Sequence, residues 1–415
     1  MSSNRLLVEA LAEIWPGVID LVDGNSSELE DRILVALHRL DAAEATHDDG
    51  ELDAAAAALV EVLKSEPRLH QEFRAAVLEL ATTTNRELLG ARPAHRCMTF
   101  PLFVATDRAP QGEHSHRTTG DPLAWATTIS TVPETHRYAL AEKPRWWRLQ
   151  FARRPDRHVT LGPMDALDPQ SLAGTMSSLL GQAPGKAFVF VHGYNTSLEQ
   201  AAARTAQLAY DLRFPGACVC YSWPSAASIT KYAADEDEAA LSARTFQDVL
   251  TQVTDALGPG SVSVIAHSMG TRLVTDALER TGERGVIPDG WLDQIILAAP
   301  DIDSRLLQRR AAAFHRLAAR TTVYSSTADK ALQLSGRIHG NSRAGADHQA
   351  LGCLAGVDII DATAARIDRT AHSYFGDSEE VVSDIFALLR HGHPPGERPR
   401  LIEKDGYWQL ARGRS

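Results

Sequence analysis

A serine between a strand-like and a helix-like segment is the residue whose surroundings most clearly indicate chemistry. Ser268 stands in the motif AHSMG (266–270), after the apolar run 261–266 and before the helical pattern 271–280. A turn this sharp strains the serine backbone, admits small residues on both sides, and presents the hydroxyl at the carboxyl edge of a sheet. Ser268 is therefore predicted to be a nucleophile, with the Met269 N–H directed at a developing oxyanion. The alternative is a serine that only caps the following helix.

A second turn could complete an oxyanion site. The run FVFVHGYN ends a strand-like segment and turns at His192 and Gly193. A turn of this kind can supply a backbone N–H facing the nucleophile, and here the donor would be Tyr194 or Asn195. The pattern also suits a plain strand-to-helix turn. We assign the following residues to the substrate pocket, although Trp223 and His267 could instead pack in the core: His192, Gly193, Trp223 and His267.

Serine is a weak nucleophile unless a histidine takes its proton. The chain has 16 histidines, so position along the chain must decide between them. His372 follows the strand-like run 357–361 and precedes a helical stretch, which is where the base of a Ser-His-Asp arrangement is found in a sheet of this type. His348 precedes that run, and His391 and His393 lie beyond the last helical stretch. His372 is therefore the predicted base.

The imidazole needs a carboxylate that orients it and stabilises its positive charge. Asp329 follows the next-to-last strand-like run and is the predicted acid. Asp301 and Asp303 follow the preceding run and are its rivals, with Asp301 retained as the alternative acid, and Asp361 is a weaker one. Asp301 could instead cap the helical stretch 304–317.

The elements that must hold these residues alternate along the second half of the chain. Short apolar runs, typical of strands covered on both faces, are separated by amphipathic helical stretches. This alternation predicts an α/β fold with a mostly parallel central sheet and helices on both sides. The predicted strands of this region are 186–191, 217–222, 261–266, 294–299, 321–326 and 357–361, and a further strand-like run lies at 97–108.

The first 90 residues differ from the rest in charge and pattern. Residues 1–90 hold 7 Lys and Arg against 18 Asp and Glu, so they account for the whole net charge of −11. Ser27 and Glu30 form a capping-box pattern ahead of residues with helical spacing. We predict a small, all-α, acidic helical domain at 1–90 that could bind a protein partner, a catalytic domain at 97–395 and a C-terminal tail at 396–415. The acidic charge argues against nucleic acid as a partner.

Composition restricts the remaining possibilities. No stretch is long and apolar enough to span a membrane, and the N-terminus does not resemble a secretory signal. Four cysteines in 415 residues suggest no disulfide framework, so a cytoplasmic protein with reduced thiols is expected. Neither the pair Cys218 and Cys220 nor the EHSH run at 113–116 has zinc-ligand spacing, so no metal is expected. The proposed chemistry requires no organic cofactor.

Several motifs together resemble one family. The chain is similar to the α/β-hydrolase superfamily, and more narrowly to a bacterial family of α/β-hydrolases of unknown function, over roughly residues 97–390. The resemblance implies serine-hydrolase chemistry but no particular substrate. The first 90 residues lie outside it. The motifs that carry it are ATDR (105–108), FVHGYN (190–195), SWPS (222–225), AHSMG (266–270), LAAPDID (297–303) and SSTADKALQLS (325–335).

These features predict a serine hydrolase that cleaves carboxylic esters through an acyl-enzyme, with Ser268, His372 and Asp329 as the triad. The polar segment 226–246 could form a cap over the site, with its acidic run 235–238 solvated. A phospholipase, a lipase or an acyltransferase with the same triad is an alternative. A catalytically silent binding module on the same fold is another. Acyl length, headgroup and oligomeric state stay open.

Overall fold

The structure is a computed structural model of the whole chain. It describes residues 97–108, 123–133, 136, 158–180, 185–226, 232–283, 287–365 and 378–411. The chain divides into two units, residues 1–97 with 142–158, and residues 98–141 with 159–415. The described residues fall almost entirely within the second unit. The predicted helical domain at 1–90 lies outside the described residues.

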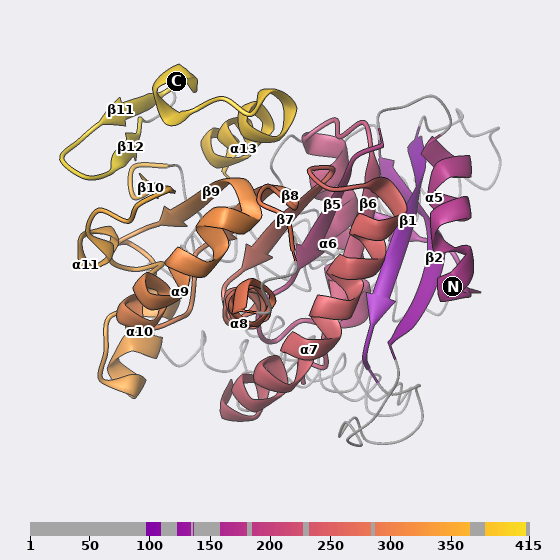
Figure 1. Cartoon of the computed structure of the whole chain (residues 1–415), viewed down its shortest axis with the longest axis horizontal. Coiled ribbons are helices and arrows are strands. Elements are labelled where there is room, and N and C mark those ends of the chain that lie inside the picture. Colours follow the sequence, from indigo (N-terminus) through magenta and orange to yellow (C-terminus); the bar gives the residue numbers. More distant parts are fainter. Residues whose placement is uncertain are drawn as a thin grey trace, which may run out of the picture. The chain divides into compact units, whose positions relative to one another are not determined.

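One mixed sheet organises the second unit (Figure 1). Its order is β11-β12-β10-β9-β8-β7-β5-β6-β1-β2-β3, with β4 paired to β2. Neighbouring strands from β12 to β1 run parallel, whereas β11 with β12, β2 with β3 and β2 with β4 are antiparallel pairs. The strands of the described residues are β1 Cys97–Thr106, β2 Ala124–Pro133, β3 Thr160–Leu161, β4 Asp165–Leu167, β5 Ala187–Val191, β6 Ala217–Ser222, β7 Val262–His267, β8 Leu292–Ala298, β9 Ala318–Ser325, β10 Val357–Asp361, β11 Leu401–Glu403 and β12 Trp408–Leu410.

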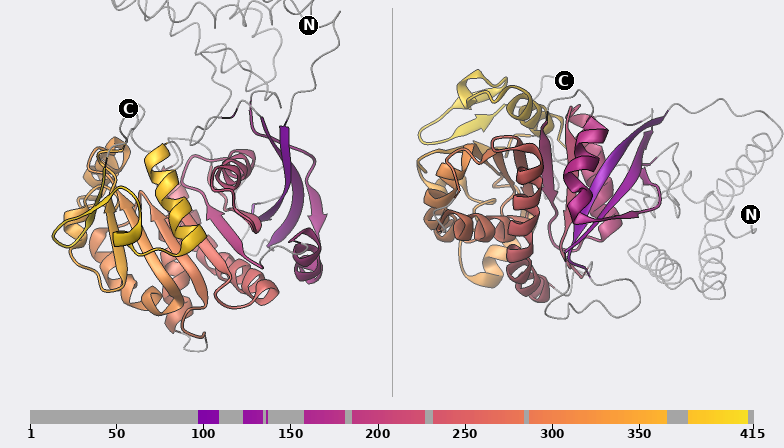
Figure 2. Two further views of the ribbon diagram at one scale, coloured as in Figure 1. Left: turned by 90° about the horizontal axis from the view of Figure 1, so that it is seen from above. Right: turned by 45° about the vertical axis from the view of Figure 1, so that its right-hand side comes forward.

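Helices cover both faces of the sheet (Figure 2). Apolar residues of α5, α7, α8 and α9 share one core with one face of the strands, and those of α6 and α13 share a second core with the other face. The helices are α5 Leu172–Leu180, α6 Leu198–Asp211, α7 Tyr232–Leu257, α8 Gly270–Glu283, α9 Ser304–Leu317, α10 Lys330–His339, α11 His348–Leu351 and α13 Glu379–His391, with short 3-10 helices at Pro169–Ser171 and Pro395–Glu397.

The central strands are apolar on both faces because both are covered. In β5, Val189 and Val191 belong to the core beneath α7 and α8, whereas Phe188 and Phe190 belong to the core beneath α6. Successive side chains of a strand point to opposite faces of the sheet. When helices cover both faces, every position of the strand is buried and takes an apolar residue. All six strands predicted between residues 186 and 361 are confirmed, with ends that shift by at most three residues.

The two borders of the sheet differ from the prediction. Residues 396–415 were predicted as a C-terminal tail, but the described part of that segment, 396–411, contributes β11 and β12, and β12 pairs with β10 through Ile360 and Asp361. The strand β2 at Ala124–Pro133 was not predicted, since its threonines and serines lack a continuous apolar run. Such border strands are short or half-exposed, so their sequences carry little of the signal that identifies a buried strand.

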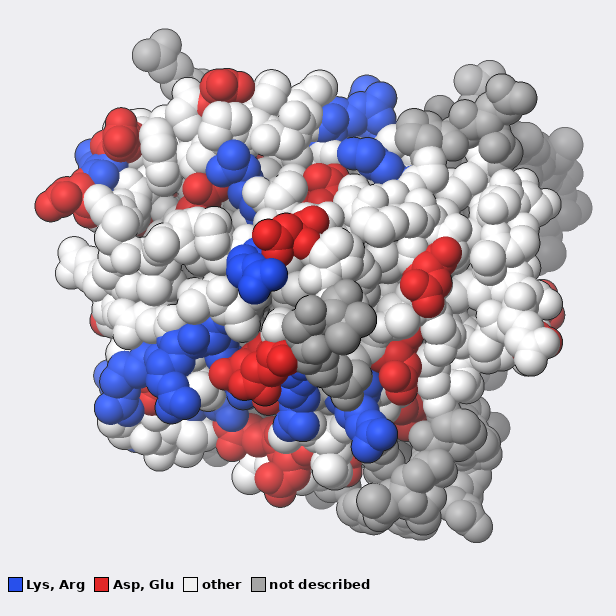
Figure 3. Space-filling model, viewed as in Figure 1, with Lys and Arg blue, Asp and Glu red and all other residues white. Residues whose placement is uncertain are grey.

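The described part of the chain contains no helix with the length and apolar character that crossing a membrane requires. Figure 3 shows acidic and basic side chains on the same face of the molecule, with basic ones gathered where α9 and α10 lie. The exposed Lys and Arg residues of these two helices are Arg305, Arg309, Arg316, Lys330 and Arg337.

Candidate active site at the carboxyl edge of the sheet

Ser268 lies on a strained turn between β7 and α8. Its φ is 51°, in the left-handed region that side chains other than glycine rarely adopt. Several hydrogen bonds hold this backbone: the Ser268 N–H donates to the Ala298 carbonyl at 3.0 Å, and the Ser268 carbonyl accepts the Thr271 N–H at 3.0 Å and the Asp301 N–H at 3.2 Å. A non-glycine residue at positive φ between a strand and a helix is the conformation expected of an activated serine on an elbow turn.

Gly270, after the serine, and Gly193, after β5, pack too closely to allow a side chain at either position. A Cβ on Gly270 would overlap the His192 carbonyl oxygen, and a Cβ on Gly193 would lie 2.9 Å from the Ser268 Cβ. We expected small residues here because the residues before and after the serine approach each other. The close contacts are instead with the end of the neighbouring strand, β5. The histidine-glycine turn and the serine turn are therefore in direct contact, as an oxyanion site needs.

The two predicted donors of the histidine-glycine turn have different surroundings. Asn195 has a φ of 52°, and its N–H donates to the Asp235 carboxylate at 3.3 Å. Within the described residues, neither the Tyr194 N–H nor the Met269 N–H has an acceptor. Of the three predicted donors, Tyr194 and Met269 are therefore the two whose N–H groups are not used within the described residues.

Arg108 ties the turns after β1, β5 and β6 together. Its guanidinium donates to Ser222 Oγ at 2.9 Å, to the Ser225 carbonyl at 2.8 Å and to the Thr196 carbonyl at 2.8 Å. Burial lowers the pKa of Arg108, but an arginine keeps its charge in proteins. This half-buried cation supplies donors to carbonyl groups of the loops that follow β5 and β6.

His192 is a buried neutral histidine. Its Nδ1 lies 2.7 Å from the Gly193 carbonyl oxygen, which can only accept, so the ring proton is on Nδ1 and Nε2 accepts from Ser222 Oγ at 3.2 Å. Burial, followed by the nearby Arg108 charge, lowers the pKa of His192 to about 3. At neutral pH this imidazole therefore carries no charge.

The predicted pocket role of His192 and Trp223 needs correction. Trp223 is fully buried, stacks on the His192 ring at 5.1 Å, and donates its indole N–H to the His192 carbonyl at 2.8 Å. These two rings lie in the interior and support the histidine-glycine turn from within. Gly193 and the partly exposed His267 lie against each other beside Ser268, as expected of residues next to the nucleophile.

The first turn of α7 is hydrogen-bonded to the turns after β5 and β6. Residues predicted as a cap followed by a separate helix form one continuous helix from Tyr232. Asp235, predicted to be solvated, is buried, and its carboxylate accepts from Ser225 Oγ at 2.6 Å and from the Ala226 N–H at 2.8 Å. The acidic run therefore contains one buried residue that joins α7 to the turns after β5 and β6.

Asp301, the alternative acid, already has both carboxylate oxygens occupied. Tyr232 donates its hydroxyl to Oδ2 at 2.5 Å, Ser335 donates to Oδ1 at 2.8 Å, and Arg343 forms an ion pair with Oδ1 at 3.3 Å. Burial and the Asp301 charge raise the pKa of Tyr232. The predicted capping role of Asp301 is wrong, because Asp303 caps α9 by accepting the Arg305 N–H.

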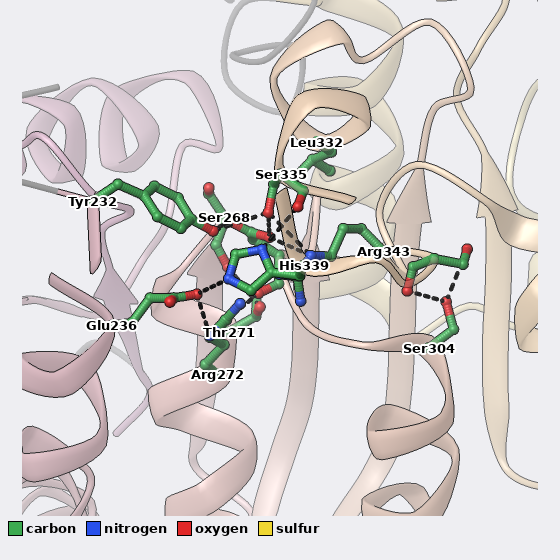
Figure 4. Close-up of polar contacts among 12 residues, drawn as sticks. Tyr232, Glu236, Ser268, Thr271, Arg272, Ser304, Leu332, Ser335, His339 and Arg343 are labelled. Atoms are coloured by element: carbon green, nitrogen blue, oxygen red, sulfur yellow. Dashed lines mark hydrogen bonds and ion pairs between the residues drawn. The ribbon is translucent and has the colours of Figure 1, made fainter. Parts of the chain in front are cut away.

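A further set of charged side chains surrounds the Asp301 cluster (Figure 4). Glu236 pairs with Arg272 at 2.6 Å and with His339 at 2.8 Å. The Arg272 Nε–H donates to the Asp301 carbonyl, and Asp301 donates its own N–H to Ser268. Side chains of α7, α8 and α10 thus contact the loop after β8, in which the Asp301 N–H donates to the Ser268 carbonyl.

Asp329, the predicted acid, is fully buried at the carboxyl end of β9. Its Oδ1 accepts the Leu332 N–H at 3.0 Å and so caps α10. Because β7, β8 and β9 are neighbours in the sheet, Ser268, Asp301 and Asp329 lie at the ends of three adjacent strands.

His372, the predicted base, lies outside the described residues. Its rival His348 is buried at the start of α11, 3.8 Å from the Asp361 carboxylate, and its ring contacts the Tyr407 ring at 4.4 Å. His391 and His393 stack on each other after α13. The rivals of the predicted base therefore have partners of their own.

Two predictions concern metal and thiol chemistry. Cys218 and Cys220 are buried in β6, and burial raises the pKa of both thiols. The described residues contain no cluster of three metal-ligating side chains, and the EHSH run at 113–116 is outside them.

Arg108, Tyr232, Asp235 and Arg343 have contacts that the sequence did not reveal. Arg108 ends the ATDR motif, so its identity within a shared motif was the one available signal. The other three belong to segments whose polar residues look solvated when the sequence is read alone.

Comparisons with known proteins give a family and distant structural likenesses. Among solved structures, the chain is similar to a hyperthermophilic esterase from Pyrobaculum calidifontis, at 14% identity and a TM-score of 0.31, over 76% of this chain and 90% of that one. It is also similar to lipase B from Aspergillus fumigatus, at 16% identity and a TM-score of 0.34, over 52% of this chain and 55% of that one. No curated protein matches the chain.

The family comparison covers the region that holds the site. The model of the family described as "Alpha/beta hydrolase of unknown function (DUF900)" matches residues 171–391, which is more than half of the chain. The match spans β5 to α13, including the turns that carry Ser268, Asp301 and Asp329. The parallel sheet with helices on both faces agrees with it. The chain therefore belongs to this family of α/β hydrolases.

Proposed function

We propose that the chain is a serine hydrolase that cleaves carboxylic esters through an acyl-enzyme. The observation that carries this proposal is the positive φ of Ser268 on a strand-to-helix turn that contacts Gly193 of the histidine-glycine turn. A strained serine in contact with a second turn that offers an N–H is the arrangement that acyl transfer requires.

The reaction uses three side chains and two backbone amides. His372 removes the hydroxyl proton as Ser268 Oγ forms a bond to the acyl carbon, and the N–H groups of Met269 and Tyr194 stabilise the oxyanion. His372 then gives that proton to the departing alcohol as the C–O bond breaks. Water then attacks the acyl carbon and loses a proton to His372. The bond between that carbon and Ser268 Oγ breaks, His372 returns the proton to Oγ, and the acid leaves. Asp329 orients the imidazole and stabilises its charge.

Asp329 is preferred to Asp301 as the acid because the Asp301 carboxylate would have to be shared. Tyr232 and Ser335 donate to it and Arg343 pairs with it, so an imidazole would have to share its oxygens with these groups. Asp329 follows β9, one strand further from Ser268, which is where the acid of a Ser-His-Asp arrangement is expected, and its Oδ1 accepts the Leu332 N–H.

A serine-directed fluorophosphonate tests the nucleophile. We expect the protein to be labelled at one site and the Ser268→Ala variant not to be labelled. Ser263→Ala, which removes another buried hydroxyl of β7, is the matched control and should label as well as the natural protein. Labelling that persists in Ser268→Ala contradicts the proposal. A folded protein that neither labels nor hydrolyses short acyl esters would favour a silent binding module.

A lipid ester is the second candidate substrate, because of an exposed apolar pair. Leu334 and Ile338 lie one turn apart on α10 and are 58% and 66% exposed, and the neighbouring Lys330 and Arg337 are exposed too. The same helix contributes Ser335 to the Asp301 cluster. If the substrate is a lipid, the double change to serine at Leu334 and Ile338 lowers activity on phospholipid vesicles but not on a short soluble ester. Equal effects on both argue against an interfacial substrate.

A further inference from the structure

A large, mostly apolar cavity lies away from the serine. It has a volume of about 1090 Å³ and is lined by the start of β1, the end of α6, the following loop, the start of β6 and part of α13. Aromatic rings dominate its wall: Phe100, Phe103, Tyr210, Phe214 and Phe386. A cavity of this size is at the upper end of the range for sites that hold small organic ligands.

The cavity lies at the opposite end of the strands from the serine. It contacts Ala217 and Cys218, which begin β6, whereas Ser222 at the other end of β6 contacts Arg108 and His192. At ~3.3 Å per residue, Cys218 and Ser222 are roughly 13 Å apart along the strand. A ligand in this cavity would therefore not be the group that Ser268 attacks.

Two charged groups of the wall are paired. His136 Nε2 lies 2.8 Å from Asp211 Oδ1, both side chains are buried, and Gln207 donates to the second Asp211 oxygen at 3.2 Å. The His136 ring also contacts the Tyr210 ring edge-on at 5.1 Å. This pair is already satisfied within the wall, and it offers no uncompensated charge to a ligand.

Arg213 is different from that pair. It lies in the loop after α6 and is exposed at the border of the cavity, and its side chain forms no hydrogen bond or ion pair within the described residues. Its neighbour Phe214 is fixed in the wall by an edge-on contact with Phe188 at 5.0 Å. Among the described residues that line the cavity, Arg213 is the one unpaired charge. The cavity thus combines an apolar interior with a single cation at its border.

We propose that this cavity binds an anionic amphiphile, such as a long-chain fatty acid, with its hydrocarbon chain against the aromatic wall and its carboxylate at Arg213. Burial of the chain supplies most of the affinity, because each CH₂ removed from water is favourable. The exposed Arg213 adds a smaller, salt-dependent part. This site is separate from the proposed active site and does not depend on its chemistry.

Fluorescence titration of the full chain with dansyl-labelled undecanoic acid tests the proposal. We expect saturable binding, with the same affinity in Ser268→Ala and after fluorophosphonate treatment. Ala209→Trp places an indole in the cavity from α6 and should weaken binding at least tenfold. Ala312→Trp, on the exposed side of α9, is the matched control and should bind normally.

A second variant keeps the test decisive if Ala209→Trp fails to fold. Arg213→Gln changes only an exposed side chain and should weaken binding of the labelled acid about fivefold, without changing binding of the corresponding labelled alcohol. The proposal is overturned if the natural protein shows no saturable binding, if a folded Ala209→Trp variant binds normally, or if the acid and the alcohol respond equally to Arg213→Gln. It is also overturned if blocking Ser268 abolishes binding, since the probe would then occupy the active site.

Discussion

The carboxyl edge of the sheet has two halves that are held by charges of opposite sign, one from the half-buried Arg108 and one from the buried Asp301. In the oxyanion half, which comprises the turns after β1, β5 and β6, the Arg108 guanidinium donates to three oxygen atoms. In the nucleophile half, which comprises the turns after β7, β8 and β9, the Asp301 carboxylate accepts from Tyr232, Ser335 and Arg343. The start of α7 contacts both halves, through Asp235 and Tyr232 respectively.

The two halves differ in which backbone groups their charges hold. The Arg108 cation binds carbonyl groups, so under the proposed function the backbone N–H groups of the oxyanion half would stay available to a substrate oxygen. The Asp301 anion holds a loop whose own N–H, that of Asp301, donates to the Ser268 carbonyl. Charged side chains from outside the two turns therefore contribute to holding them.

The largest expected effect is on kcat, and it distinguishes Asp329 from Asp301, the two carboxylates of the nucleophile half. Asp329→Asn should lower kcat about 10³- to 10⁴-fold, because an asparagine cannot stabilise the imidazolium or hold the required tautomer. Asp301→Asn should lower kcat less than about tenfold, since it would act only through the position of the loop. Steady-state kinetics on a short acyl ester measures both. The opposite ranking would assign Asp301 as the acid.

The next largest effect concerns the oxyanion half. Arg108→Met should lower the free energy of unfolding by about 3 kcal/mol, because it leaves buried carbonyl groups of Thr196 and Ser225 without donors. Urea unfolding measures the change. Arg305→Met is the control, since that side chain is 80% exposed, and it should cost less than about 0.5 kcal/mol. Equal losses in the two variants would show that Arg108 does not hold the turns.

The corresponding change in the nucleophile half should cost less stability. Asp301→Asn keeps the shape and one acceptor of the carboxylate but loses the ion pair with Arg343, so we expect a loss of about 2 kcal/mol in the free energy of unfolding. Asp303→Asn is the matched control, because asparagine caps a helix as well as aspartate does. If Asp301→Asn lowered the free energy of unfolding more than Arg108→Met, the nucleophile half would depend more on its charged side chain than the oxyanion half does.

The last effect is a pH dependence of the oxyanion half. His192 has a folded pKa of about 3, below its unfolded value of 6.5, so the unfolded chain binds a proton first as the pH falls. This group therefore lowers the free energy of unfolding by up to about 1.4 kcal/mol per pH unit between about pH 6.5 and pH 3. His192→Gln lacks this contribution. Its stability relative to the natural protein should improve as the pH falls from 7 to 5 in urea titrations, and a pH-independent difference contradicts the buried neutral histidine.

The sequence alone determined the central strands and the turn that carries the nucleophile. Strands such as Ala187–Val191 and Val357–Asp361 were found within a residue, because a strand buried on both faces needs consecutive apolar side chains. Gly270 and Ser268 were recognised because small residues must flank an elbow turn. These signals are local, since each depends on residues close together in the chain.

Only the tertiary structure decided which polar residues are buried and which they contact. Asp235 and Asp237 are two residues apart on α7, yet the first is buried among turns from β5 and β6 and the second is exposed. Asp301 meets partners from α7, α10 and the loop after α10, which lie 34 to 69 residues away along the chain. In the sequence, a buried aspartate and an exposed aspartate can have the same kind of neighbours. Its role depends on whether distant segments bring donors to it, and only the folded arrangement of those segments decides that.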